Sequence, residues 1–122
     1  MKITDLEQYL RAAGQRVETL AGGDEQSYMV VRDVELPHGG LKGKRCDIAI
    51  LRSEAEPYVA PAAIHTHPAL VPMVWQDPLK TQPSNVGPGW QYWSRRFDKP
   101  CTPQNLWAHI LTTLCDPRWQ PA

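Results

Sequence analysis

The sequence predicts an α+β fold with an N-terminal helix, an antiparallel four-stranded meander and a C-terminal helix. Apolar residues recur at helical spacing in residues 3–13 and 102–115, and four shorter stretches with apolar alternation lie between positions 16 and 66. Strands joined by short connections pair antiparallel with their neighbours, and helices packed on one face of such a sheet define the α+β class. A chain of 122 residues is expected to form a single domain, residues 1–122, around one core.

The first expected helix covers residues 3–13. Leu6, Tyr9 and Leu10 share one face of it, and Gly14 follows as a stop signal. Alternating apolar residues, bounded by glycine and proline, then predict the four strands, which are Arg16–Leu20, Ser27–Leu36, Arg45–Arg52 and Ala62–Thr66.

The second expected helix covers residues 102–115. Thr102 is a suitable N-cap because its hydroxyl can accept a free backbone N–H, and Pro103 falls where a missing N–H costs nothing. An apolar stripe follows at helical spacing, formed by Leu106, Trp107, Ile110, Leu111 and Leu114. Before this helix, residues 69–89 show no periodicity, and the many prolines there predict an ordered loop.

Composition argues against several classes of function. The 13 basic and 13 acidic residues cancel, whereas binders of nucleic acid or membrane surfaces need a basic excess, so we expect neither partner. No apolar run is long enough to span a bilayer, and residues 1–14 lack the apolar segment of a secretory signal. Three widely spaced cysteines predict reduced thiols and a cytoplasmic location.

Five segments resemble motifs of a known protein family. In chain order they are ELPHGGLKGKRCDIAIL at 35–51, YVAP at 58–61, HPA at 67–69, GWQYWSRR at 89–96 and CTPQNLWAHILTTLCDP at 101–117. The second, third and last resemble the YPxxPP turn, the HPN motif and the helix-leading W-SPAL segment of ubiquitin-conjugating (E2) enzymes. The first and fourth resemble the strand and the WQRWSRH signature of a bacterial E2-like group. The resemblance implies a ubiquitin-conjugating-enzyme-like fold over most of the chain.

The resemblance also implies a place in a bacterial ubiquitin-like protein conjugation pathway. An E2-type transferase would accept a ubiquitin-like modifier from an E1-like activating enzyme as a thioester and pass it to an amine. The alternative is a catalytically inactive E2-fold module that binds a ubiquitin-like protein or an E1 without covalent chemistry. Both leave the E1-like enzyme and the modifier as expected partners, and neither requires a cofactor.

Three residues are candidates for the transfer chemistry. Cys101 lies just before the last expected helix and near Lys99, and both neighbours favour a thiolate. Ser94 stands where a resembling E2 has its nucleophilic cysteine, and its hydroxyl would need an adjacent base to form an oxyester. The candidate bases are His65, His67 and His109, and His67, from the HPN-like motif, alternatively fixes the turn. Ala69 replaces the asparagine that would stabilise the oxyanion, which favours the inactive module.

The short segment 90–96 is rich in aromatic and arginine residues. These are Trp90, Tyr92, Trp93, Arg95 and Arg96. Aromatic residues and arginine are enriched at the centres of protein interfaces, so this segment is a candidate partner-binding surface. The alternative is a corner of the core, in which the tryptophans fill space and the arginines are solvated.

The remaining histidine and cysteine residues allow further readings. His65 and His67 share one side of an expected strand at a spacing that suits a metal, but no third ligand is apparent, so no metal is expected. A hydrolase or metal protein that uses these two histidines with Asp77 is a third reading of the function. Cys46 and Cys115 fall on apolar faces and are expected in the core.

Overall fold

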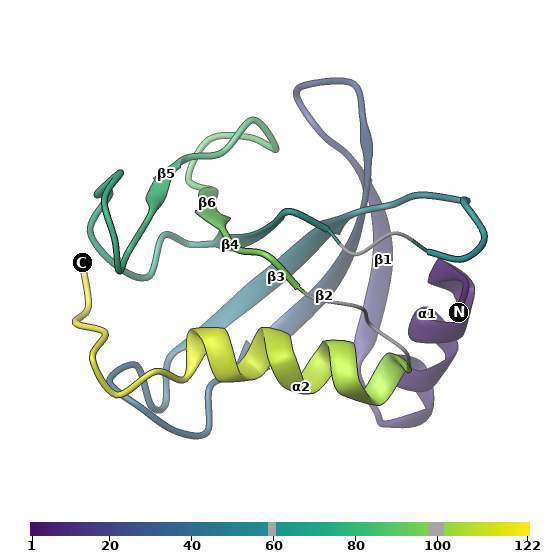
Figure 1. Ribbon diagram of the computed structural model, residues 1–122, viewed down its shortest axis with the longest axis horizontal. Coiled ribbons are helices and arrows are strands. Elements are labelled where there is room, and N and C mark those ends of the chain that lie inside the picture. The colour runs from purple at the N-terminus through teal and green to yellow at the C-terminus, as the bar shows by residue number, and fades with distance from the viewer. Residues whose placement is uncertain (59–60, 98–101) are drawn as a thin grey trace.

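The computed structural model describes residues 1–58, 61–97 and 102–122, and it has the α+β architecture expected from the sequence (Figure 1). Its elements follow the chain as α1 (Ile3–Ala12), β1 (Arg16–Ala21), β2 (Ser27–Glu35), β3 (Arg45–Leu51), β4 (Ala63–His67), β5 (Thr81–Pro83), β6 (Gln91–Ser94) and α2 (Pro103–Leu114). The two expected helices and the four expected strands are all present, with ends that differ from the expected bounds by a single residue.

The described strands form one antiparallel sheet in the order β1-β2-β3-β4-β6-β5. The meander over β1 to β4 is confirmed, but the expectation of four strands was wrong, because the sheet contains six strands within the residues that the structure describes. The two additional strands, β5 and β6, are only three and four residues long. Strands this short cannot show an alternating pattern. β5 lies in the proline-rich residues 69–89, which were expected to form a loop, and β6 lies in the aromatic segment that follows, where no strand was expected.

The start of α2 follows the expected capping. The Thr102 hydroxyl oxygen accepts a hydrogen bond from the Asn105 N–H at 3.1 Å, and Pro103 is the first helical residue. The apolar stripe faces inward, since Leu106, Trp107, Ile110 and Leu114 are buried and Leu111 packs against the same core in a half-buried position. In the part of the chain that the structure describes, no helix is long and apolar enough to cross a membrane.

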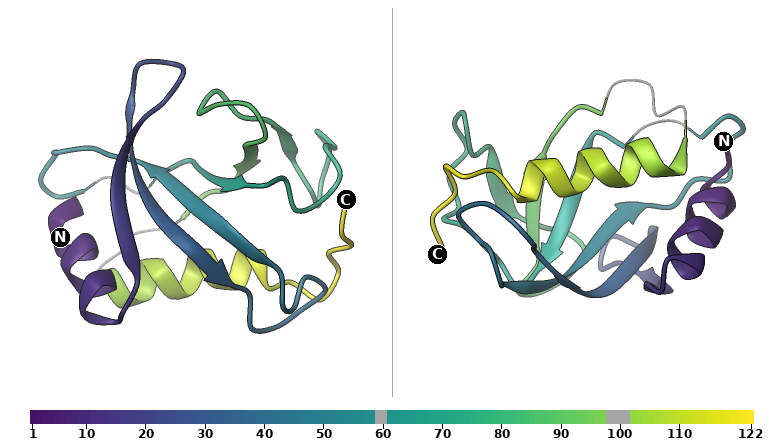
Figure 2. Two further views of the ribbon diagram at one scale, coloured as in Figure 1. Left: turned by 180° about the vertical axis from the view of Figure 1, so that it is seen from behind. Right: turned by 90° about the horizontal axis from the view of Figure 1, so that it is seen from below.

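Both helices pack on one face of the sheet, which we call the inner face. Figure 2 shows α2 lying across the sheet, with α1 near the start of α2 and beside β1. One apolar cluster joins the helices to inward-facing strand residues, which include Met29, Val31, Ile48, Ile50, Ile64 and Trp93. Burial of this apolar surface is the main force that holds the two layers together.

The opposite face, the outer face, is partly covered by the loop of residues 84–90 between β5 and β6. Its side chains Val86 and Trp90 pack in a second apolar cluster with Tyr28, Val30 and Ala49. The Gly23 N–H donates to the Val86 carbonyl at 3.0 Å and ties this loop to the β1–β2 turn. β2 is therefore covered on both faces, which explains why its apolar residues run consecutively instead of alternating.

Candidate functional site

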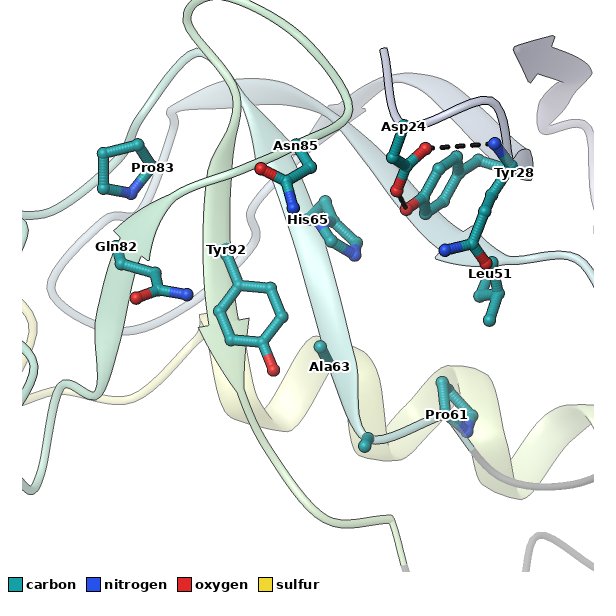
Figure 3. A pocket seen from close by; sticks show the side chains of 12 residues that line it. Asp24, Tyr28, Leu51, Pro61, Ala63, His65, Gln82, Pro83, Asn85 and Tyr92 are labelled. Atoms are coloured by element: carbon teal, nitrogen blue, oxygen red, sulfur yellow. Dashed lines mark hydrogen bonds between the residues drawn. The ribbon is translucent and has the colours of Figure 1, made fainter. Parts of the chain in front are cut away.

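A pocket of about 360 Å³ opens on the outer face of the sheet (Figure 3). Its volume is within the range of small-molecule and side-chain binding pockets. The lining comes from five separate parts of the chain and consists of Asp24, Gln26, Tyr28, Leu51, Pro61, Ala62, Ala63, His65, Gln82, Pro83, Asn85 and Tyr92. The alternation of side chains along the strands puts the pocket on the outer face. Tyr28, His65 and Tyr92 point outward into it, while the neighbouring residues Met29, Ile64 and Trp93 point into the inner core.

Asp24 and Tyr28 form one wall of the pocket. The Tyr28 hydroxyl donates to Asp24 Oδ2 at 2.6 Å, and the Gln26 N–H donates to Asp24 Oδ1 at 3.1 Å. The hydrogen bond from Tyr28, supported by the backbone N–H of Gln26, lowers the pKa of the Asp24 carboxyl. Burial and the neighbouring carboxylate raise the pKa of Tyr28. At neutral pH this wall therefore carries one negative charge, held in place by a neutral phenol.

His65 lies at the centre of the pocket floor and is 7% exposed. Its Nδ1 atom is 2.7 Å from the Ser84 hydroxyl oxygen. That oxygen already accepts the Val86 N–H at 3.0 Å, so the Ser84 O–H is free to donate to Nδ1. Burial lowers the pKa of His65 to about 4. The imidazole is therefore neutral at neutral pH and adds no charge to the pocket.

Aromatic rings run in an unbroken row across the outer face. The His65 ring contacts Tyr28 at 5.2 Å on one side and Tyr92 at 5.4 Å on the other, both edge to face. Beyond Tyr92, the Trp75 ring lies 6.0 Å from the tyrosine, and Trp75 is 48% exposed. The Lys80 ammonium lies 4.6 Å from the centroid of Trp75. This row provides ring faces and edges for a bound group at the mouth of the pocket.

The structure does not bring the three candidate catalytic residues together. Ser94 pairs with Ala63 at one end of β4, whereas His67 pairs with Asp47 at the other end. The four residue steps from Ala63 to His67 separate the two positions by roughly 13 Å at the usual rise of a strand. His67 instead contacts the Trp90 ring at 5.3 Å. Cys101 lies outside the described residues.

The two tryptophans of the candidate partner-binding segment are buried. Trp93 is 0% exposed, and its indole N–H donates to the Thr66 hydroxyl at 3.0 Å within the inner core. Trp90, the last residue of the loop of residues 84–90, packs in the outer-face cluster. Both indoles therefore fill space in the two cores, as in the second interpretation of this segment.

The other three members of that segment reach the surface. Tyr92 is half-buried and lines the pocket. Arg95 is also half-buried, and it donates to the Ser94 carbonyl at 2.6 Å and to the Pro78 carbonyl at 3.2 Å. Arg96 is exposed. Any partner contact made by this segment would therefore involve these three side chains.

The third interpretation of the sequence was a hydrolase or metal protein that uses His65, His67 and Asp77. The two histidines do share the outer face of β4, but His65 bonds to Ser84 and His67 stacks near Trp90. Asp77 is exposed in the turn that precedes β5. Within residues 1–58, 61–97 and 102–122, no three His, Cys, Asp or Glu side chains are grouped to hold a metal ion.

Asp24, Tyr28 and Ser84 were not predicted as site residues. Asp24 belongs to a glycine-rich turn, Tyr28 to an apolar strand and Ser84 to the loop of residues 84–90, so no local motif links them. The available signal was weak: Tyr28 shares its strand face with Val30, and a tyrosine there needs a partner for its hydroxyl. Only the strand order β2-β3-β4-β6 brings these residues to His65 and Tyr92.

Comparison of the chain with protein-family models, with curated proteins and with solved structures gives no match.

Proposed function

We propose that the protein is an E2-like component of a ubiquitin-like protein conjugation pathway that carries the modifier as a thioester. The observation that supports the proposal is the arrangement of the elements. α1, the strands β1 to β3, the segment that contains Tyr58, β4 and the crossing helix α2 follow in the order that the resemblance implies. Tyr58 is buried in the inner core and donates its hydroxyl to the Leu51 carbonyl at 2.8 Å, so the turn is anchored before β4 begins.

Cys101 is the proposed carrier of the modifier. It immediately precedes Thr102, the N-cap of α2, and the positive end of a helix favours a thiolate. The thiolate sulfur attacks the carbonyl carbon of the E1–modifier thioester, a new C–S bond forms, and the E1 cysteine leaves as a thiolate. An amine of the target later attacks the same carbonyl carbon, loses its proton to solvent and releases Cys101 as a thiolate.

A second candidate function is the catalytically inactive E2-fold module, which binds a ubiquitin-like protein or an E1 non-covalently. The separation of Ser94 from His67 favours this candidate, because a serine at the motif position has no histidine of that motif to activate it. Ala69, in place of the asparagine of the HPN motif, favours it as well. Tyr92, Arg95 and Arg96 are the side chains of the candidate segment that such a partner would contact.

The proposal is tested by incubating the protein with an E1-like enzyme, ATP and a ubiquitin-like modifier encoded beside it. We expect an adduct that is cleaved by reductant, is absent from Cys101→Ala and is retained by the matched control Cys115→Ala. An adduct that survives reductant, yields to mild alkali and disappears on Ser94→Ala would move the reaction to the serine. Binding of the modifier or the E1 without any adduct would establish the inactive module. Failure of both adduct and binding would overturn the E2-like assignment.

The proposed location is the cytoplasm, where E1-like enzymes have ATP and thiols stay reduced. Cys46 is buried in the inner core and Cys115 packs against its edge. The adduct and binding experiment tests the place in the pathway, whereas the outer-face pocket can be examined separately.

A further inference from the structure

The outer-face pocket has a definite charge. Among the described side chains that line it, Asp24 is the one carboxylate, and neither lysine nor arginine is present. His65 is neutral because burial lowers its pKa to about 4. The pocket therefore has a net negative charge at neutral pH. It disfavours phosphates and carboxylates and favours ligands that carry a positive charge.

Asp24 has the capacity to accept a further donor. An ionised carboxylate offers about four acceptor sites. Tyr28 and Gln26 occupy one site on each oxygen. Because the Tyr28 hydroxyl donates to Oδ2, the carboxylate is held in one orientation against the pocket. A cation that reaches it pays little to order this group.

The aromatic walls suit the same kind of ligand. Tyr28 and Tyr92 flank His65, as Figure 3 shows, and a cation is attracted to the face of a tyrosine ring. The protein already uses this interaction in the same row of rings, where the Lys80 ammonium lies 4.6 Å from the Trp75 centroid. Tyrosine rings combined with one carboxylate make a site for an ammonium or guanidinium group.

The rim of the pocket indicates where such a group comes from. Gln26, Gln82 and Asn85 are exposed side-chain amides, and each offers both donors and an acceptor. That combination matches the N–H and C=O groups of a peptide backbone. The volume of about 360 Å³ is larger than one basic side chain requires, which leaves room for the adjoining main chain.

From these observations we propose that the outer-face pocket binds a lysine or arginine side chain of a partner polypeptide. The cationic head lies against the half-buried Tyr92 ring and pairs with the Asp24 carboxylate, which the buried Tyr28 holds in place. The rim amides hold the backbone on either side of it. This inference concerns the face of the sheet away from α2 and does not depend on the thioester chemistry.

The test uses the full chain and defined probes. An N-acetylated, C-amidated pentapeptide with a central lysine is titrated by calorimetry, and the Gln82 and Asn85 side-chain amide resonances are followed by NMR. The same is done with a central arginine, with the neutral analogues acetyl-lysine and citrulline, with a phosphoserine peptide and with butylammonium. We expect the basic peptides to bind about tenfold more tightly than their neutral analogues, as one desolvated cation site contributes.

Variants assign the binding to the pocket. Asp24→Asn keeps the shape and should lower the affinity for the basic peptides about tenfold, and Tyr92→Leu, which removes a partly exposed ring, should lower it as well. Glu25→Gln removes the same charge one residue away, outside the pocket lining, and should leave the affinity unchanged. Thermal melts of each variant show whether the fold is retained.

The outcomes separate the proposal from its rivals. Equal affinity for basic and neutral peptides, preference for phosphoserine, or binding that Asp24→Asn leaves intact would overturn the cation site. Butylammonium that binds as tightly as the peptides would overturn the polypeptide partner and indicate a small amine ligand. No heat and no resonance shift at millimolar peptide would overturn the proposal entirely.

Discussion

The buried side-chain amide of Gln91 forms two hydrogen bonds with the backbone of Val71. Its Nε2 donates to the Val71 carbonyl at 2.8 Å, and its Oε1 accepts the Val71 N–H at 3.3 Å. Oε1 also accepts the Leu70 N–H at 2.8 Å. Gln91 is 0% exposed. One side chain of β6 therefore satisfies three backbone groups of a segment that has no strand partner of its own. It holds residues 70–71 against the sheet that carries the pocket.

Gln91→Leu should destabilise the protein strongly. The leucine fills a similar volume but leaves two N–H groups and one carbonyl without a partner in a buried place. Each unsatisfied group costs about 1–3 kcal/mol, so the free energy of unfolding should fall by about 3 kcal/mol or more in a urea titration. Gln82→Leu, on the exposed side of the neighbouring strand β5, is the matched control and should change it little. Equal stability of the two variants would show that the Leu70 and Val71 backbone groups are solvated.

A second prediction concerns the place where the C-terminal segment packs on the loop between β2 and β3. The Gly40 N–H donates to the Asp116 carbonyl at 3.2 Å, and a Cβ on Gly40 would collide with the Trp119 carbonyl oxygen. Gly40→Ala should therefore lower the free energy of unfolding by about 2 kcal/mol or more, since backbone must move to admit the methyl group. Gly87→Ala meets only an ordinary contact, 3.5 Å from the Trp90 ring, and should melt like the parent protein. A Gly40→Ala variant with the parental melting temperature would contradict this packing.

The longer elements were predictable from the sequence because each extends over at least five residues. α1, α2, β1, β3 and β4 present enough apolar positions to reveal a period, and β2 is a longer apolar run between turn residues. β5 and β6 do not, and their place in the sheet comes from pairing with a distant strand, as β6 does with β4. Such pairing depends on tertiary contacts that local sequence does not record.

The site was less predictable than the fold. His65 and Tyr92 were noted in the sequence, but for a metal and for a partner surface, respectively. Their contact, at 5.4 Å between ring centroids, exists because β6 pairs with β4. Trp93 shows the same limit. Whether this indole points inward depends on which alternate residues of β6 face the inner core. The pairing of Trp93 with Ile64 of β4 decides this, and no local sequence pattern specifies that pairing.

The three thiols should differ in reactivity, with Cys101 first and Cys46 last. Burial raises the pKa of the Cys46 thiol to about 12, with the Asp47 carboxylate adding to the effect, so its reactive thiolate is scarce at neutral pH. Cys115 is half-buried at the end of α2. Cys101 precedes the α2 N-cap, where a thiolate is favoured. Brief alkylation at neutral pH followed by peptide mass spectrometry gives the order, with Cys115→Ser as the control for assignment. Labelling of Cys46 or Cys115 ahead of Cys101 would contradict it.

The last prediction is a loss of stability in mild acid that depends on His65. Burial lowers the pKa of His65 from 6.5 to about 4 in the folded protein, while Asp24, Tyr28, Tyr92 and Ser84 are the groups that face its ring. Between these two pH values the unfolded chain binds a proton that the folded chain does not. Stability is therefore unaffected above pH 6.5, falls as the pH decreases toward 4, and has no further His65 contribution below that.

The size of the effect follows from the difference between the two pKa values. At about 1.4 kcal/mol for each pH unit, the folded state should lose about 3 kcal/mol relative to the unfolded state across this window. Urea titrations at closely spaced pH values measure the loss. His65→Gln keeps an acceptor for the Ser84 hydroxyl and cannot titrate, so its stability should vary less with pH by that amount. His38→Gln, in an exposed loop, should retain the full dependence. If the parent protein and His65→Gln followed the same pH profile, the imidazole would not be buried in its neutral form, and the negative charge assigned to the pocket would lose its support.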